Sequence, residues 1–177
     1  MNIWHDIDVQ RITPEEFVAI TEISSGSKNK YELDKETGLL RLDRVLHASM
    51  HFPANYGFIP RTYADDDDPL DVLILCSESI VPMTLVDCYP VGVMKMIDSG
   101  QIDEKIIAIC KTDPYYNNFY DISDFPEHAL NEIIHFYAFY KLLEHKETMV
   151  REFLGREEAI KTISQCIKNY KTRFSGQ

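Results

Sequence analysis

Residues 65–76 read Asp-Asp-Asp-Asp-Pro-Leu-Asp-Val-Leu-Ile-Leu-Cys, so an acidic stretch runs directly into an apolar one. The apolar run follows Pro69 and carries no charge after Asp71, which is typical of a buried central strand. Five carboxylates fall within residues 65–71, where an ordinary solvated turn is the simplest alternative. The stretch therefore predicts a strand in the middle of a sheet, with negative charge concentrated where that strand begins.

The whole chain is acidic and has the composition of a globular protein. Its 177 residues include 29 Asp and Glu against 18 Lys and Arg, a net charge of −11, and 45% are hydrophobic. We expect a single domain over residues 1–177. The acid excess argues against DNA, RNA or an anionic membrane as a partner, and fits a cation or an anion that arrives with cations. No signal peptide is visible and the longest apolar run, 72–76, is too short to cross a membrane, so we expect a cytoplasmic protein.

The first two thirds of the chain predict strands and the last third predicts helices. Besides 71–76, strands are expected at 19–24, 30–33, 39–42, 85–97 and 104–110, with a turn and a short extended piece at 55–60. The turn 34–38 predicts a hairpin, and Pro90 with Gly92 predicts a bend or bulge. Apolar residues at helical spacing predict one helix from Pro126 to about Glu144 and another over 156–174. This order predicts a mainly β, α+β fold, a small barrel with two C-terminal helices packed outside it.

The acidic stretch favours a metal site. In an extended segment alternate residues point the same way, so Asp66 and Asp68 can converge, and a turn at Pro69 lets Asp71 join them. Three adjacent carboxylates need compensating charge, which a hard cation such as Mg²⁺ or Mn²⁺ supplies. A register shifted by one residue, using Asp65 and Asp67, stays open. An EF-hand loop is excluded because its glycine and closing glutamate positions are not filled.

Other charged residues are candidates for the same site. Asp98 and Asp103 flank a Ser-Gly turn, with Lys105 two residues further on, although an ordinary hairpin explains them as well. Lys30 and Glu32 share one face of a strand, where a salt bridge is the alternative. Further bases are Arg44 and Lys141, of which the lysine could instead snorkel to solvent.

Several other chemistries lack support in the sequence. No pair of the four cysteines has CxxC spacing, so they are expected to be small buried thiols. His47 and His51 are four residues apart but are not on an expected helix, and an Asp-rich site prefers harder ions than zinc. Neither a phosphate-binding glycine loop nor a GxSxG motif is present, so nucleophilic serine or cysteine catalysis has no motif behind it.

Together these pieces resemble the soluble family I inorganic pyrophosphatases. The strongest match is 66–72, Asp-Asp-Asp-Pro-Leu-Asp-Val, which fits the D-x-D-P-x-D-x signature of that family. The neighbouring motifs occur in the family's order over about residues 18–145. They are Glu22-Ile23, the Lys30-Tyr31-Glu32 hairpin through Gly38, Asp43-Arg44, 53–57, 90–98, Asp103 with Lys105, and Tyr140-Lys141.

The resemblance implies a five-stranded OB-type barrel, and a hydrolase of phosphate metabolism that splits diphosphate into two phosphates with Mg²⁺ and a metal-activated water. About three or four magnesium ions would bind with the substrate, with Mn²⁺ as a substitute. Family analogy also implies a homo-oligomer, a hexamer. The implied metal ligands are Asp66, Asp71, Asp98, Asp103 and Glu32, supported by Glu22. The implied phosphate ligands are Lys30, Arg44, Lys105, Tyr140 and Lys141, with Tyr56 orienting the acidic loop, and Asp68 is the candidate base.

One departure and two rival hypotheses stand beside this reading. Phe52 occupies a position where many family members have tyrosine, so a hydroxyl that would touch phosphate is missing, and Lys146 is a poorly matched further candidate for phosphate. A catalytically inactive OB-type binding module would be expected to lose a metal ligand or Lys30, and neither is lost. A divalent-cation buffer would not need Arg44 and the lysines around the acids.

Overall fold

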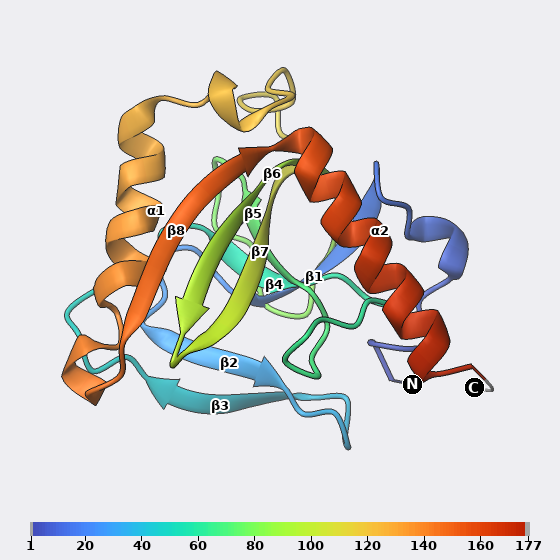
Figure 1. The fold of residues 1–177 in the computed structure, drawn as a ribbon, viewed down its shortest axis with the longest axis horizontal. Coiled ribbons are helices and arrows are strands. Elements are labelled where there is room, and N and C mark those ends of the chain that lie inside the picture. The colour runs from blue at the N-terminus through green and yellow to red at the C-terminus, as the bar shows by residue number, and fades with distance from the viewer. Residues whose placement is uncertain (1, 176–177) are drawn as a thin grey trace.

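Five strands close into a ring at the centre of the molecule (Figure 1). The structure is a computed structural model that describes residues 2–175, so residues 1, 176 and 177 of the expected domain lie outside the described residues. The strand order is β1-β4-β5-β7-β6, and β6 pairs again with β1 to complete the ring, which confirms the five-stranded barrel. The ring strands are β1 (Phe17–Ile23), β4 (Asn55–Phe58), β5 (Asp71–Leu75), β6 (Leu85–Asp98) and β7 (Gln101–Cys110).

The long strand β6 closes the ring because it changes partners half-way. Its first part pairs antiparallel with β1, from Leu85 opposite Ile20 to Cys88 opposite Phe17. Its second part pairs instead with β8 (Thr148–Gly155) on the outside of the ring. The register with β7 slips between Pro90 and Gly92, because proline has no N–H to give to the ladder. The bulge expected from these two residues is confirmed.

Strand β5 lies between β4 and β7 and has the buried character that its sequence predicts. Val72, Leu73 and Ile74 are almost completely buried. The pairing with β7 is parallel and sets Asp71 opposite Lys105. The first residue of this buried strand therefore carries a carboxylate beside a lysine.

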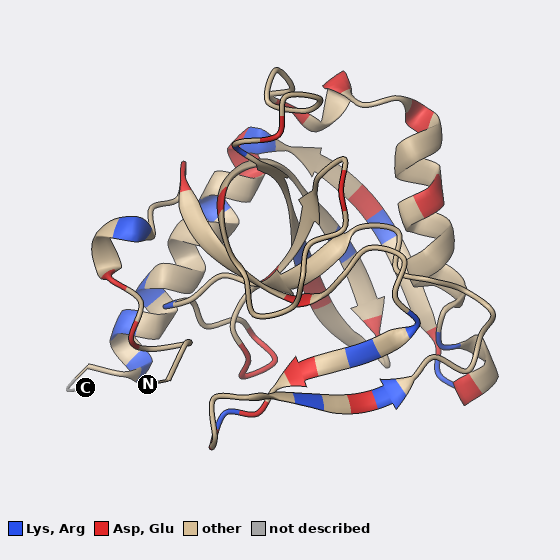
Figure 2. Ribbon diagram, turned by 180° about the vertical axis from the view of Figure 1, so that it is seen from behind, with Lys and Arg blue, Asp and Glu red and all other residues tan. Residues whose placement is uncertain are grey.

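A separate hairpin of β2 (Asn29–Leu33) and β3 (Leu40–Val45) lies below the ring in Figure 1. Its turn ends at Gly38, whose φ of 74° is left-handed and suits glycine. Basic and acidic residues follow one another along both strands (Figure 2). The hairpin expected from residues 30–42 is confirmed.

The C-terminal third differs from expectation in two places. Helix α1 (Glu127–Phe139) begins directly after Pro126, one residue later than expected, and ends before Lys141, where the chain enters the short 3₁₀ turn η3 (Leu142–Glu144). The expected helix to Glu144 is therefore too long. Strand β8 is not predicted by the sequence. Its register with β6 slips between Lys95 and Met96, so Arg151 has no residue opposite it and the polar and apolar residues of β8 do not alternate regularly. The other elements are α2 (Arg156–Arg173), as expected, η1 (Val9–Arg11) and η2 (Ile122–Asp124).

Apolar residues pack on both sides of the ring strands. Alternate residues such as Leu73 and Ile107 contact a cluster that includes Phe136 of α1. Their neighbours, such as Val72, contact a cluster that includes Ile163 of α2. Each helix thus covers one apolar face. Three of the four cysteines are buried and all four are free thiols, close to expectation. Within residues 2–175 no helix combines the length and apolar character needed to span a membrane.

Candidate active site

A cavity of about 340 Å³ opens where β5 begins, between the acidic loop, the β2–β3 hairpin and the turn after α1. Its wall brings together residues that are up to about 120 positions apart in the chain. All of the expected site residues except Arg44 line it. They are Glu22, Lys30, Glu32, Tyr56, Asp66, Asp68, Asp71, Asp98, Asp103, Lys105, Tyr140 and Lys141.

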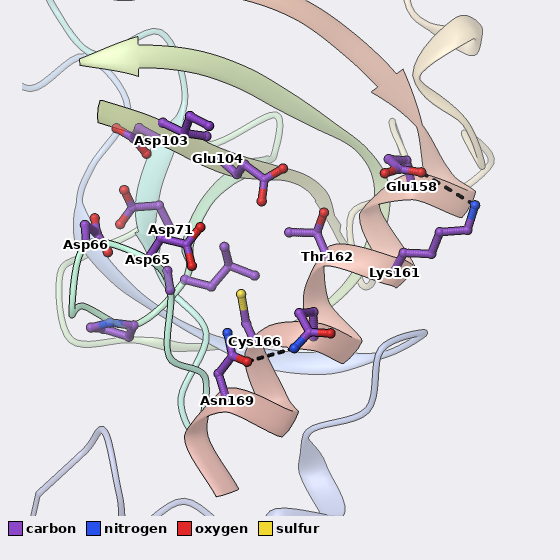
Figure 3. Close-up of a pocket in the computed structure, with 15 residues that line it drawn as sticks. Asp65, Asp66, Asp71, Asp103, Glu104, Glu158, Lys161, Thr162, Cys166 and Asn169 are labelled. Carbon is purple, nitrogen blue, oxygen red and sulfur yellow. Dashed lines mark hydrogen bonds and ion pairs between the residues drawn. The ribbon is translucent and has the colours of Figure 1, made fainter. Parts of the chain in front are cut away.

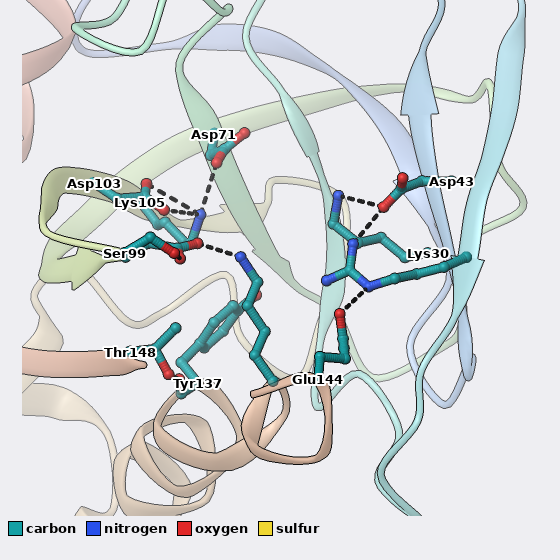
Figure 4. Close-up of polar contacts among 12 residues, drawn as sticks. Lys30, Asp43, Asp71, Ser99, Asp103, Lys105, Tyr137, Glu144 and Thr148 are labelled. Carbon is teal, nitrogen blue, oxygen red and sulfur yellow. Dashed lines mark hydrogen bonds and ion pairs between the residues drawn. The ribbon is translucent and has the colours of Figure 1, made fainter. Parts of the chain in front are cut away.

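The floor of the cavity is a buried lysine between two carboxylates (Figure 4). Lys105 is only 3% exposed. Its Nζ lies 2.7 Å from the Asp71 carboxylate and 3.0 Å from that of Asp103, and it donates to the Tyr56 hydroxyl at 3.0 Å. Burial alone would lower the pKa of Lys105, but the facing Asp71 and Asp103 carboxylates raise it well above its ordinary value. The lysine therefore remains charged and neutralises the floor.

Three further lysines pair with carboxylates around the rim. Lys30 contacts Glu32 and lies 3.4 Å from the Asp43 carboxylate. The other two rim pairs are Lys35 with Asp68 and Lys141 with Asp98. Strand geometry does not account for the last two pairs, because one joins the hairpin to the acidic loop and the other joins the turn after α1 to β6. The pocket is thus a set of seven carboxylates, five of which face an ammonium group.

Two carboxylates of the pocket lack such a partner among the described residues. Burial and the nearby Asp71 charge raise the pKa of Asp66 to about 6. Burial, again with Asp71, raises the pKa of Glu22 to about 8, although Glu22 accepts a hydrogen bond from Leu33 N–H at 2.7 Å. Both pKa shifts have the same physical causes, burial first and then negative charge in excess of the local cations. That imbalance favours binding of a further cation.

The acidic loop converges on the pocket by a turn and not by the extended backbone that we expected. Asp67 has a left-handed φ of 67°, and Asp68 N–H donates to Asp66 Oδ1 at 3.2 Å. Asp66 and Asp68 consequently line the pocket. Asp67 instead bonds to the Tyr63 hydroxyl, and Asp65 faces a second cavity. The alternative register, with Asp65 and Asp67 in the pocket, does not match this geometry.

Comparisons with known proteins agree on one family. The model of the family described as inorganic pyrophosphatase matches residues 19–171. Soluble inorganic pyrophosphatase 2 of Chlamydomonas reinhardtii is 47% identical, over 97% of this chain and 89% of its own. The soluble inorganic pyrophosphatase of Oryza sativa subsp. indica is 48% identical, over 94% of this chain and 78% of its own. The chain belongs to the family I inorganic pyrophosphatases.

Solved structures show the same fold. The inorganic pyrophosphatase of Thermus thermophilus superposes with a TM-score of 0.92 at 36% identity, covering 97% of this chain and 99% of that one. The enzyme of Helicobacter pylori gives 0.89 at 40% identity, covering 94% and 99%. The expected family, fold and activity are confirmed: this pyrophosphatase is an inorganic diphosphatase, a hydrolase, and its family depends on magnesium.

The donor chemistry of the pocket fits magnesium. Within residues 2–175 the lining side chains supply carboxylate and phenol oxygens and include neither cysteine nor histidine. Hard divalent cations prefer such oxygen ligands. No group of three acids among these residues already forms a metal cage, since Lys105 lies between Asp71 and Asp103. The pyrophosphatase thus presents the right ligand atoms, with ammonium groups beside them.

Arg44 is the one expected residue that does not line the pocket. Its guanidinium contacts Asp43, and its Nε lies 2.7 Å from the carboxylate of Glu144 (Figure 4). The Glu144 side chain is 6% exposed, so the charge is buried. Sequence reasoning missed Glu144, because a glutamate three residues after Lys141 carries no signal of a partner one hundred residues away.

Phe52 and Lys146, the two positions that match the family pattern poorly, lie away from the pocket. Phe52 is buried behind it, with ring centroids 5.9 Å from Tyr56 and 4.9 Å from Phe136. Phenylalanine in place of tyrosine at this position therefore changes the packing next to Tyr56 and not the wall of the pocket. Lys146 is exposed and does not line the cavity.

A second cavity, of about 330 Å³, lies on the other side of the acidic loop (Figure 3). Helix α2 and strand β7 form its other walls, and Asp66, Asp71 and Asp103 line both cavities. The acidic loop therefore has open space on two sides.

Proposed function

We propose that this pocket binds pyrophosphate together with magnesium, and that Asp68 accepts the proton of the attacking water. The observation that carries the proposal is the convergence of seven carboxylates and three lysines from the sequence motifs on one cavity. A bare tetra-anion would be repelled by the carboxylates. When pyrophosphate arrives with its cations, the carboxylates face the cations and the lysines face the phosphate oxygens.

Asp66, Asp71, Asp98, Asp103 and Glu32 are proposed to hold magnesium, about three or four ions in all with substrate bound, and Mn²⁺ would substitute. Magnesium, when bound, neutralises phosphate oxygens and makes a coordinated water more acidic. Glu22 supports these ligands from behind, because its carboxylate ties β1 to the backbone of the hairpin at Leu33.

The basic residues are proposed to bind phosphate oxygens. Lys30, Lys105 and Lys141 already point into the cavity, and each pairs with a carboxylate that magnesium would share. The phenol groups of Tyr56 and Tyr140 add neutral donors, which charged phosphate oxygens accept. Arg44 lies opposite Lys30 in the hairpin and would serve the same phosphate while Glu144 orients its guanidinium.

Asp68 differs from the proposed metal ligands in a way that suits a base. Its side chain is 47% exposed, whereas those of Asp71 and Asp103 lie on the buried floor. A carboxylate that is reachable by water, and not fully committed to a metal, can take up a proton.

On the larger scale we propose that residues 1–177 act as one domain, in a cytoplasmic homo-oligomer, a hexamer by family analogy. Removal of pyrophosphate would draw biosynthetic reactions forward. Light scattering coupled to size exclusion measures the assembly directly, and a mass equal to that of one chain at micromolar concentration would contradict the oligomer.

The test of the catalytic proposal is phosphate release from pyrophosphate over a range of Mg²⁺ concentrations, with wild type compared with Asp68→Asn. We expect Asp68→Asn to lower kcat by about 10²–10⁴-fold, because a base in the transition state contributes that much. Asp87→Asn, on an exposed part of β6, is the matched control and should retain the wild-type rate. Equal rates for wild type and Asp68→Asn would refute the role of Asp68.

A further inference from the structure

Lys35 lies in the turn of the β2–β3 hairpin and lines the pocket, yet the hairpin motif that contains it gives it no role. Its ammonium pairs with the Asp68 carboxylate and donates to the backbone carbonyl of Asp67 at 3.2 Å. Within residues 2–175 it is the basic partner of Asp68. One side chain from the hairpin thus holds two consecutive residues of the acidic loop.

The tether is itself anchored, unlike an ordinary surface lysine. Lys35 Nζ stands 5.6 Å from the centroid of the Trp4 ring, and the Lys35 carbonyl accepts from the Asn2 side chain at 3.3 Å. Trp4 is buried and donates its Nε1–H to the Thr62 carbonyl at 2.9 Å. A fixed aromatic ring under the ammonium restricts where the lysine head can go.

The Asp68 carboxylate needs such a tether. Asp67 has a left-handed φ, a conformation that costs energy for any residue with a Cβ. Cavities lie on both sides of the loop. The backbone of Asp68 is held within the loop, since Ala64 N–H donates to its carbonyl at 2.8 Å, but its carboxylate is oriented from outside.

We propose that Lys35 is a positioning residue that holds the Asp68 carboxylate in the direction from which it accepts the proton, a role that rests on the function proposed for Asp68. Removing the ammonium would leave the carboxylate free to rotate while the loop backbone stays in place. A misplacement of about 1 Å at a reacting group can cost about 10²-fold in rate.

Lys35→Met keeps the length of the stem and removes the charge. We expect kcat to fall about 10–100-fold while KM changes less than about threefold, and we expect Lys35→Arg to recover most of the rate. Lys111→Met is the matched control, because Lys111 is 48% exposed, pairs with Glu16 and lies away from the pocket. The thermal midpoint and the calorimetric affinity for Mg²⁺ without substrate should match wild type in all three variants, since exposed pairs contribute little to stability.

A double-mutant cycle separates this inference from the proposal for Asp68. If Lys35 acts through Asp68, Lys35→Met changes the residual rate of Asp68→Asn less than twofold. An equal fold-loss in both backgrounds, a change confined to KM, or a rate like that of Lys111→Met would each overturn the positioning role. Full activity of Asp68→Asn would instead overturn the proposed base, whatever Lys35→Met does.

Discussion

The ring of strands and the β2–β3 hairpin both supply charged groups to the pocket, but they hold these groups in different surroundings. Lys105 and Asp71 stand side by side on two buried ring strands. Lys30, Glu32 and Lys35 belong to a hairpin with two strands and an exposed turn. Removing a charged side chain from the ring should therefore destabilise the fold, because it leaves a buried ion without its partner. Removing a charged side chain from the hairpin should cost little stability.

Two glycines test this difference at the level of the backbone, and they give the largest expected effect. A Cβ on Gly57 of β4 would lie 1.9 Å from the Ile20 carbonyl oxygen of β1, so Gly57→Ala must push two ring strands apart. We expect a loss of more than about 4 kcal/mol in the free energy of unfolding. Gly38→Ala in the hairpin adds left-handed strain, about 1–2 kcal/mol. Urea unfolding of both variants measures the difference, and similar losses would refute the distinction.

The floor lysine should matter to stability almost as much. Lys105→Met leaves Asp71 and Asp103 without their cation, and removal of one partner from a buried ion cluster costs about 3–5 kcal/mol. Urea unfolding in EDTA should show this loss, and added Mg²⁺ should recover part of it by binding the same carboxylates. Lys95→Met removes a lysine that lies 3.4 Å from Glu104 outside the pocket, and should cost less than about 1 kcal/mol. Equal losses for the two lysines would contradict a special role for the floor.

Local spacing explains why so much of the fold and pocket can be predicted from the sequence. The acidic motif sits next to the apolar strand that orients it, and the two-residue period of a strand places Lys30 beside Glu32. Turn residues mark the hairpin and the bulge in β6. These features depend on neighbours within a few positions in the chain, so one sequence suffices to see them.

The missed features depend on contacts between distant segments. Strand β8 has an irregular alternation and forms only because the second half of β6 offers it an edge. Lys35 and Asp68 are 33 residues apart, so nothing in the sequence indicates that they pair, and Lys35 alone looks like an ordinary turn residue. The turn at Tyr140 also ends α1 earlier than its apolar spacing indicates, which moves Lys141 off the helix and toward Asp98.

Glu144 gives the smallest effect and links the two regions. It is a buried carboxylate from the turn after α1 that contacts Arg44 of the hairpin, and its Oε2 has no hydrogen-bond partner among the described residues. Glu144→Gln keeps the shape but removes the charge that orients the guanidinium. If Arg44 binds phosphate, KM should rise roughly tenfold while kcat changes less than about threefold, because one charge-assisted bond is worth about 1.5 kcal/mol. Steady-state kinetics decide this, with exposed Glu147→Gln as the control. A fall in kcat at constant KM would instead mean that the turn positions Lys141 and Tyr140 for the chemical step.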